Sequence, residues 1–332
     1  MTTIHDVARH AGVSVATVSR VLNNSGTVRT DTRARVLAVI DQLDYHPSAM
    51  GQSLRLNRTR IVMVVVPEVT NPFVGEVVYS MELAARSRGY SILLHEYHGD
   101  QLTDLQLQQY VSTRRIDGLI FLTAEAREKQ FQQLAQQLPT ILACEYVDHW
   151  DIPSVSIDNI AATLDVMRYL MGLGHTRILL ISGSAGNVSA RDRLRGYRIA
   201  HEQAGLPVCE ELLQEAEPTP AAAYATLTGA VERGLDFTAV FCASDVLAIG
   251  ALRALQDKGL AVPRDVSVVG FDDIMFAPFL NPALTTVHQP AREIGERAIA
   301  MWLCAAEGKA QDYPVTVRHE LRIRDSCAVA RR

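Results

Sequence analysis

The sequence predicts a small all-α helix-turn-helix head followed by a larger α/β core with two open parallel sheets. Residues 3–23 contain two short amphipathic helical patterns on either side of a glycine-containing turn, which is the layout of a helix-turn-helix. Beyond residue 60, short apolar runs alternate with amphipathic stretches, and this alternation starts again near residue 177. The core therefore has two halves, and open sheets of this kind bind ligands between the halves, outside the carboxyl ends of the strands.

Each part of the helix-turn-helix pattern has a physical reason. Thr3 and Asp6 have the spacing of a capping box, which starts a helix. Gly12 supplies the backbone freedom that ends the first helix, and Ser14 is suited to cap the second. The inward-facing positions of the two helices are Val7, Ala8, Val18, Val21 and Leu22.

The second helix leaves polar and small side chains on or near its outer face, at the end where a recognition helix meets base edges. An ordinary helical hairpin whose glycine is only a C-cap has the same pattern, so the residues that follow also bear on DNA binding. The sequence predicts a third helix over residues 30–43 and a linker over residues 45–58. The outer-face residues are Val15, Ala16, Thr17, Ser19 and Arg20, and the apolar stripe of the third helix is Val36, Leu37, Val39, Ile40 and Leu43.

Charge is divided between the head and the core. Residues 1–60 contain eight arginines, four aspartates and no lysine or glutamate, so their formal charge is +4 in a chain of net charge −5. A basic head on an acidic body suits a segment that neutralises phosphates beside a part that avoids DNA. The charge distribution thus agrees with the motif in pointing to DNA.

Composition and cysteine usage indicate a globular protein of the cytosol. Hydrophobic residues make up 48% of the chain and charged residues 21%. The chain begins directly with the helical motif, with no apolar signal-peptide segment, and its longest apolar run, residues 61–66, is too short to span a bilayer. We expect a soluble, cytoplasmic protein with no cofactor, no metal site and no disulfide framework. The cysteines are scattered and never in C-x-x-C spacing: Cys144, Cys209, Cys242, Cys304 and Cys327.

The core pattern predicts buried parallel strands separated by helices. The strands of the first half are expected at residues 61–66, 91–94, 118–122, 140–143 and 155–157, and those of the second half at 177–182, 239–242 and 266–271. The helices are expected at residues 74–88, 102–114, 128–137, 161–173, 190–204, 221–233 and 246–258.

Short motifs occur in a fixed order along the whole chain. They are Ile4-x-Asp6-Val7-Ala8, Ala16-Thr17-Val18-Ser19-Arg20-Val21-Leu22-Asn23, Tyr45-x-Pro47-Ser48, Asn71-Pro72-Phe73, Ile157-Asp158-Asn159, Leu173-Gly174-His175, Arg193-Leu194-x-Gly196-Tyr197, Ser244-Asp245, Gly270-Phe271-Asp272-Asp273 and Leu284-Thr285-Thr286-Val287-x-Gln289-Pro290. Each motif is weak alone, but together they make the chain resemble the LacI/GalR family of bacterial transcription regulators over essentially its whole length.

The resemblance implies a dimeric repressor that binds pseudo-palindromic operator DNA. It implies a head at residues 1–46, a hinge at 47–59 and a core at 60–332 that is similar to periplasmic sugar-binding proteins. The core would comprise an N-subdomain (60–160 and 290–320) and a C-subdomain (161–289 and 321–332). A small effector between the subdomains would change the spacing of the two heads. The chain has no C-terminal heptads after residue 324, so a homodimer is expected rather than a tetramer.

The resemblance also assigns DNA-binding residues. Arg20 would make a bidentate contact with guanine, although a phosphate contact is the alternative. Leu54 would wedge between base pairs at the operator centre, or pack against the partner hinge. Gly51-Gln52 replaces the family's usual Ala-Arg, and because glycine costs about 1 kcal/mol of helix propensity, we expect a hinge helix that forms only on DNA. Val15 and Ala16 match base-reading positions, and Thr3, Ser14, Thr17, Ser19 and Asn23 complete the DNA-binding set, with phosphate contacts assigned to the last four.

For the effector, Asp272 and Arg193 are the strongest candidates. A carboxylate and a guanidinium facing each other across a cleft suit sugar or ribose hydroxyls, and a structural ion pair is the alternative. Phe73 would stack on a ring, and Tyr146 matches an aromatic wall position or a core position. We expect a neutral sugar first and a nucleoside second. Further family positions in the cleft are Asp158, Asn187, Ser189, Ser244 and Gln289.

Two other classes of protein share parts of this pattern. A sugar-active α/β enzyme would have a similar composition, but the sequence lacks Gly-x-x-x-x-Gly-Lys-Ser/Thr, Gly-x-Ser-x-Gly and His-Glu-x-x-His. A free-standing sugar-binding protein would have a signal peptide and no basic head. We therefore expect a regulator and no enzymatic activity.

Overall fold

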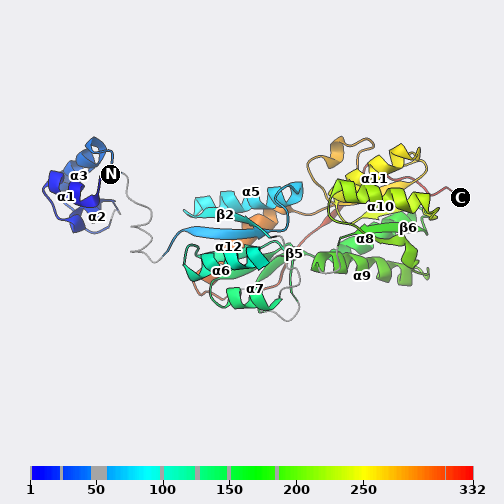
Figure 1. Cartoon of the computed structure of the whole chain (residues 1–332), viewed down its shortest axis with the longest axis horizontal. Coiled ribbons are helices and arrows are strands. Elements are labelled where there is room, and N and C mark those ends of the chain that lie inside the picture. The colour runs from blue at the N-terminus through cyan, green and yellow to red at the C-terminus, as the bar shows by residue number, and fades with distance from the viewer. Residues whose placement is uncertain are drawn as a thin grey trace. The chain divides into compact units, whose positions relative to one another are not determined.

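The computed structural model describes residues 2–22, 25–45, 58–97, 101–123, 128–147, 151–183, 187–310 and 312–331. The chain divides into two compact units, Met1–Thr59 and Arg60–Arg332, which correspond to the blue head and to the remainder of the chain in Figure 1. The predicted fold class, a helix-turn-helix head and an α/β core with two sheets, is confirmed.

The head consists of α1 (Ile4–Ala11), α2 (Val15–Leu22) and α3 (Thr30–Gln42). The capping box of Thr3 and Asp6 is present, and Gly12 ends α1 with a left-handed φ of 62°. Valines of all three helices meet in a core of their own. Leu37 was expected in this core but is 48% exposed, because it lies about 100° around α3 from Val36, which is fully buried.

The second unit contains two six-stranded sheets. Sheet A has the strand order β11-β5-β4-β3-β1-β2 and is entirely parallel, and sheet B has the order β12-β10-β9-β8-β6-β7 with one antiparallel pair, β10 with β12. The strands of sheet A are β1 (Ile61–Val66), β2 (Ser91–Glu96), β3 (Gly118–Phe121), β4 (Thr140–Ala143), β5 (Ser154–Ile157) and β11 (Val315–Val317). Those of sheet B are β6 (Ile178–Ser182), β7 (Leu213–Glu215), β8 (Ala239–Cys242), β9 (Ser267–Asp272), β10 (Thr285–His288) and β12 (Glu320–Arg322).

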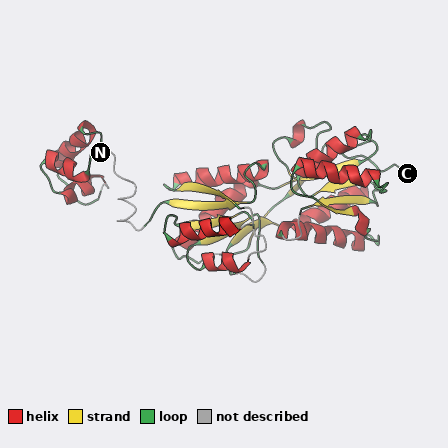
Figure 2. Ribbon diagram, in the orientation of Figure 1, coloured by secondary structure: helices red, strands yellow, loops and turns green. Residues whose placement is uncertain are grey.

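Helices cover both faces of each sheet (Figure 2). They begin where expected because Asn71, Asp158, Asn187, Thr219 and Ser244 each accept a backbone N–H bond as N-caps. The helices are α5 (Pro72–Ser87), α6 (Gln101–Ser112), α7 (Glu128–Ala135), α8 (Asn159–Gly172), α9 (Val188–Gln203), α10 (Pro220–Glu232), α11 (Asp245–Asp257) and α12 (Ala291–Ala306), with 3-10 turns η1 (Glu210–Leu212) and η2 (Ala277–Phe279).

The apolar runs are buried on both faces, as parallel strands require. In β1, Val64 packs in the cluster that contains residues of α5 and α12, whereas Val65 packs with residues of α6 and α7. In β6, Leu180 belongs to the cluster with α8 and α9, and Ile181 to the cluster with α10 and α11. Alternate residues of one strand thus fill two separate layers of core.

The chain passes between the two sheets three times, after β5, after β10 and after β11. We call sheet A with α5, α6, α7 and α12 the N-subdomain, and sheet B with α8, α9, α10 and α11 the C-subdomain. The strands β7, β10, β11 and β12 and the helix α12 have no counterpart in the ranges predicted from sequence. These four strands lack the uninterrupted apolar runs of β4 and β8, whereas α12 has helical spacing and was missed.

The contact of α5 with α12 depends on a glycine. A Cβ added at Gly295 would lie 2.7 Å from the Val77 carbonyl oxygen and 3.0 Å from the Met81 nitrogen, both in the backbone of α5. Backbone atoms cannot rotate away as a flexible side chain does. The two helices therefore approach each other as closely as a glycine permits.

Replacing Gly295 with alanine will destabilise the core. We expect the free energy of unfolding to fall by about 1–3 kcal/mol, because the new methyl group must push α5 from α12. Gly75→Ala is the matched control: nothing lies within 4 Å of its added Cβ, so this variant should gain about 0.5–1 kcal/mol of stability. Urea unfolding of both variants gives the comparison, and equal midpoints would contradict this account of the helix contact.

Candidate DNA-reading helix and ligand cleft

The outer face of α2 presents Ala16 and Arg20 to solvent. No described residue forms an ion pair with Arg20, so its guanidinium is available to an external partner. Ser14 accepts the Thr17 backbone N–H at 3.2 Å and shares a 2.9 Å hydrogen bond with the Thr17 hydroxyl, which caps α2. The predicted position of Ser14 as a helix cap is confirmed.

The remaining residues of the predicted DNA-binding set differ in how far they are exposed. Val15, Thr17 and Ser19 are half-buried. Thr3 is exposed, and its hydroxyl donates to Asp6 at 2.7 Å as part of the capping box. Asn23, Leu54 and the Gly51 hinge lie outside the described residues.

A cleft of about 850 Å³ opens between the carboxyl ends of the two sheets. This volume is in the range of pockets that hold a small molecule. Among the predicted effector residues, the cleft brings together Phe73 from the N-subdomain, Gln289 from the segment between β10 and α12, and Asn187, Ser189, Arg193, Ser244 and Asp272 from the C-subdomain.

Arg193 of α9 is 9% exposed and is held on three sides. Its Nε donates to Asn159 Oδ1 at 3.0 Å, its Nη1 donates to the Ala243 carbonyl, and the guanidinium lies 3.7 Å from the centre of the Phe271 ring. Burial lowers the pKa of Arg193, and the nearby carboxyl of Asp272 counteracts this effect. These contacts fix the guanidinium in one orientation at the base of the cleft.

Asp272 ends β9 and is 6% exposed. Its Oδ1 accepts a hydrogen bond of 2.7 Å from Gln289, and burial raises its pKa to about 6 against the opposing effect of Arg193. Arg193 and Asp272 both belong to the C-subdomain, so the expectation that they face each other across the cleft is wrong. The alternative of a structural ion pair is not observed between these two side chains either, since Arg193 is occupied by other partners.

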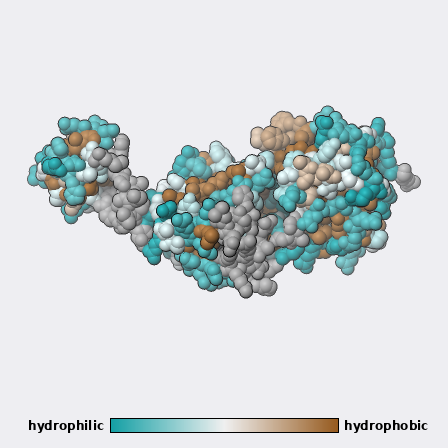
Figure 3. All heavy atoms as spheres, viewed as in Figure 1, coloured by the Kyte–Doolittle hydropathy of each residue, from teal (hydrophilic) through white to brown (hydrophobic). Residues whose placement is uncertain are grey.

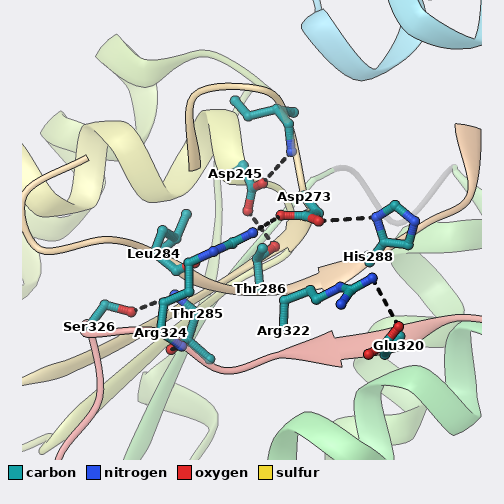
Figure 4. Close-up of polar contacts among 11 residues, drawn as sticks. Asp245, Asp273, Leu284, Thr285, Thr286, His288, Glu320, Arg322, Arg324 and Ser326 are labelled. Atoms are coloured by element: carbon teal, nitrogen blue, oxygen red, sulfur yellow. Dashed lines mark hydrogen bonds and ion pairs between the residues drawn. The ribbon is translucent and has the colours of Figure 1, made fainter. Parts of the chain in front are cut away.

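A polar network supports the turn after β9 (Figure 4). Asp272 and Asp273 have left-handed φ angles of 111° and 56°, which are costly for residues with side chains. The Asp273 carboxylate accepts from Arg324 at 2.6 Å and from His288 at 3.0 Å. Asp245, fully buried, accepts the Ile274 backbone N–H at 2.9 Å. The turn that presents Asp272 is therefore anchored on both sides.

Glu145 is a cleft residue that the sequence prediction missed. It follows β4, is 4% exposed, and accepts bonds from the Ser189 backbone N–H at 3.2 Å and hydroxyl at 2.9 Å. Burial raises the pKa of Glu145 to about 7. This pair joins the N-subdomain to the C-subdomain directly. The sequence does contain a feature that predicts this position: Glu145 is an acidic residue just beyond the carboxyl end of an apolar strand, as Asp272 is at the end of β9.

Two predicted effector residues do not line the cleft. The Tyr146 hydroxyl donates to Asp192 Oδ2 at 2.5 Å and so makes a second link between the subdomains. Asp158 is exposed and caps α8 by accepting the Ala161 N–H at 2.9 Å. Its neighbour Asn159 is the buried residue that holds Arg193.

The described part of the chain contains no group of three His, Cys, Asp or Glu side chains that could hold a metal ion. No helix within that part is long and apolar enough to cross a bilayer.

Known proteins resemble both units. Residues 3–48 match the family model of bacterial regulatory proteins, lacI family, and residues 167–327 match that of a periplasmic binding protein-like domain. The HTH-type transcriptional repressor PurR of Yersinia pestis bv. Antiqua (strain Antiqua) is 33% identical over 99% of this chain and 97% of its own length. The lac repressor dimer bound to operator and the anti-inducer ONPF superposes with a TM-score of 0.89 at 26% identity, covering 98% of this chain and 99% of that one. The transcriptional regulator CelR–cellobiose complex has a TM-score of 0.76 and 29% identity, covering 98% of this chain and 100% of that one.

Replacing Glu145 with glutamine will flatten the pH dependence of stability. The folded chain keeps the Glu145 proton up to about pH 7, whereas the unfolded chain releases it near the ordinary value of 4.5. The unfolded state thus binds fewer protons in this window, and the free energy of unfolding falls as the pH rises through it. We expect the wild-type chain to lose about 2 kcal/mol more than Glu145→Gln across the window, measured by urea unfolding.

The exposed Glu202, which lies on α9 outside the cleft lining, provides the matched control. Glu202→Gln should keep the wild-type slope of stability against pH. Identical slopes for the wild type and Glu145→Gln would show that Glu145 is ionised in the folded chain throughout the window.

Proposed function

The chain belongs to the lacI family of bacterial regulatory proteins, and we propose that it is a dimeric transcriptional repressor whose operator affinity is switched by a small effector. The observation that carries this proposal is the presence, in one chain, of an exposed reading helix and a two-walled cleft spanned by hydrogen bonds. The relatives reported above are regulators, and we assign no enzymatic activity.

Operator binding rests on α2. The exposed Arg20 is suited to a bidentate contact with guanine in the major groove, and Ala16 permits close approach of the helix to the bases. Ser14 and Thr17, which already cap α2, lie where a phosphate would meet the positive end of the helix. This division of roles gives specificity to Arg20 and position to the cap.

Dimer formation is supported by an apolar surface on the C-subdomain. Met275, Phe276 and Phe279 around η2 are exposed, Phe279 at 84%, and they form the apolar patch over this loop in Figure 3. A groove of about 370 Å³ lined by residues of α11 and the segment 260–282 includes Leu280, the residue after Phe279. Apolar patches of this kind mark protein interfaces, and the solved lac repressor is a dimer on operator DNA. We assign this surface to the homodimer.

The effector switch rests on the two links between the subdomains. Glu145–Ser189 and Tyr146–Asp192 hold the walls of the cleft at one spacing. A ligand that replaces or reinforces these bonds changes the relative free energies of the open and closed arrangements. Such a two-state element couples the cleft to the heads of a dimer.

A neutral sugar is the first choice of effector and a nucleoside the second. Asp272, Gln289 and Asn187 supply donors and acceptors at fixed positions, and Phe73 offers an apolar face. The likeness to a regulator solved with cellobiose supports the sugar.

Arg20→Ala will lower specific DNA binding. We expect affinity for a duplex selected from a random library by the wild-type chain to fall by about 1–3 kcal/mol, with little change for non-specific duplex. Arg35→Ala removes the same charge from an exposed position on α3 and should leave the ratio of the two affinities unchanged. A uniform loss on both duplexes for Arg20→Ala, measured by fluorescence anisotropy, would identify a phosphate contact instead.

A thermal-shift screen with neutral sugars and nucleosides tests the effector. A ligand at about 100 times its dissociation constant stabilises the folded chain by about 2.7 kcal/mol, which raises the melting temperature by several degrees. Asp272→Asn should remove the shift. Asp158→Asn, which keeps a helix-capping side chain at an exposed site outside the cleft, should retain it. The absence of any shift with neutral sugars would overturn the first choice.

A further inference from the structure

Carboxylates dominate the described lining of the cleft. Six acidic side chains, Glu68, Glu96, Glu145, Glu215, Glu217 and Asp272, line it, whereas Arg193 is the single Arg or Lys among its described residues. Glu145 keeps its proton up to about pH 7, and the other five carboxylates still exceed what is needed to neutralise Arg193. An anionic ligand, such as a phosphorylated sugar, would enter a region of the same sign.

Four of these carboxylates lie on opposite walls. In the N-subdomain, Glu68 and Glu96 lie at the carboxyl ends of β1 and β2. In the C-subdomain, Glu215 and Glu217 lie at the carboxyl end of β7. None of the four forms an ion pair with a described residue. Within the described part of the chain, the two walls therefore carry like charges with no ion-pair partner.

At the base of the cleft, one oxygen of the Asp272 carboxylate accepts no hydrogen bond from a described residue. Asp272 is more than nine-tenths buried and uses Oδ1 to accept from Gln289, while its Oδ2 accepts no hydrogen bond from a described residue. Arg193, the nearest cation, is directed to Asn159, the Ala243 carbonyl and the Phe271 ring. A carboxylate oxygen with no hydrogen bond from a described residue, at the base of the cleft, favours a ligand that donates, and most strongly one with a charged donor.

A bound metal ion does not account for the carboxylates. The described residues contain no group of three or more potential ligands close enough to share one ion. The acidic side chains are instead distributed over both walls and the base, which suits an extended organic molecule.

We propose that the effector is a polyhydroxylated ligand with a protonated amine, that is, an amino sugar. This inference rests on the proposed effector role of the cleft and narrows its ligand class. The amine binds among the carboxylates, and the hydroxyl groups bind Asn187, Gln289 and the free N–H groups of Arg193. Positive charge between the walls offsets the repulsion of Glu68 and Glu96 from Glu215 and Glu217, so the amine favours the closed arrangement.

Calorimetry with the full chain tests this proposal at about pH 6.5, where an amino sugar is largely protonated. The probes are glucosamine and galactosamine, their N-acetyl derivatives, glucose, galactose and glucose 6-phosphate. We expect at least one amine to bind about tenfold more tightly than its N-acetyl and unsubstituted counterparts, a difference of about 1.4 kcal/mol. Glucose 6-phosphate should not bind.

A double variant, Glu215→Gln with Glu217→Gln, removes the negative charge of one wall while keeping side chains of similar size. Its affinity for the amine should fall roughly three- to tenfold more than its affinity for a neutral sugar, because the change removes the charge of one wall. The matched control, Glu76→Gln with Glu202→Gln, removes two exposed carboxylates outside the cleft lining and should leave both affinities unchanged.

The outcomes distinguish this proposal from the effector role itself. Neutral sugars that bind as tightly as the amines, or binding of glucose 6-phosphate, would overturn the amine while leaving a sugar effector in place. Binding of none of these probes would overturn both the amine and the sugar.

Discussion

Arg193 is a cation buried at the carboxyl edge of sheet B, and much of the cleft is arranged around what a buried cation requires. Removing a guanidinium from water is costly unless hydrogen bonds and opposite charges replace the solvent. Asn159 supplies one acceptor directly after the chain has crossed from β5, Ala243 supplies a second at the end of β8, and Phe271 supplies a ring face in β9. Three separate elements of the C-subdomain thus converge on one side chain, and the next residue of β9, Asp272, is thereby positioned beside it.

The two walls of the cleft differ in how they are held. The C-subdomain wall is fixed by Arg193 and by the bonds of Asp273 to Arg324 and His288. The N-subdomain wall is linked to it by hydrogen bonds to α9: Glu145 accepts two from Ser189, and Tyr146 donates one to Asp192. Polar links of this kind are strong only while they are shielded from water, so they are suited to being exchanged for bonds to a ligand.

Sequence patterns predicted the strands that consist of continuous apolar runs, and did not predict four strands without such a run or polar residues whose role depends on a distant partner. The apolar runs of β1, β4 and β8 predict strands correctly because both faces of each are buried. Thr285–His288 has no such run, and its place in sheet B is set by pairing with β9 and β12.

The site residues were harder to predict than the strands. The family likeness placed Asp158 in the cleft, but its carboxylate caps α8. The next residue, Asn159, is the one that is buried and contacts Arg193. The position of Glu145 just beyond β4 could have been read from the sequence, but its bond to Ser189, 44 residues away, could not. The roles of the α2 residues and of Leu54 stay predictions.

The three crossings between the sheets also constrain how the chain acquires its structure. Sheet A is completed by β11 and sheet B by β12, and these strands are separated by only Arg318 and His319 near the end of the sequence. Because proteins are synthesised from the N-terminus, both sheets lack an edge strand until residues 315–322 have left the ribosome. Neither subdomain therefore has all of its strands before the other is almost fully synthesised. A chain cut short before residue 315 would expose the edge of β5 in sheet A and the edge of β10 in sheet B, each a template for pairing with other chains.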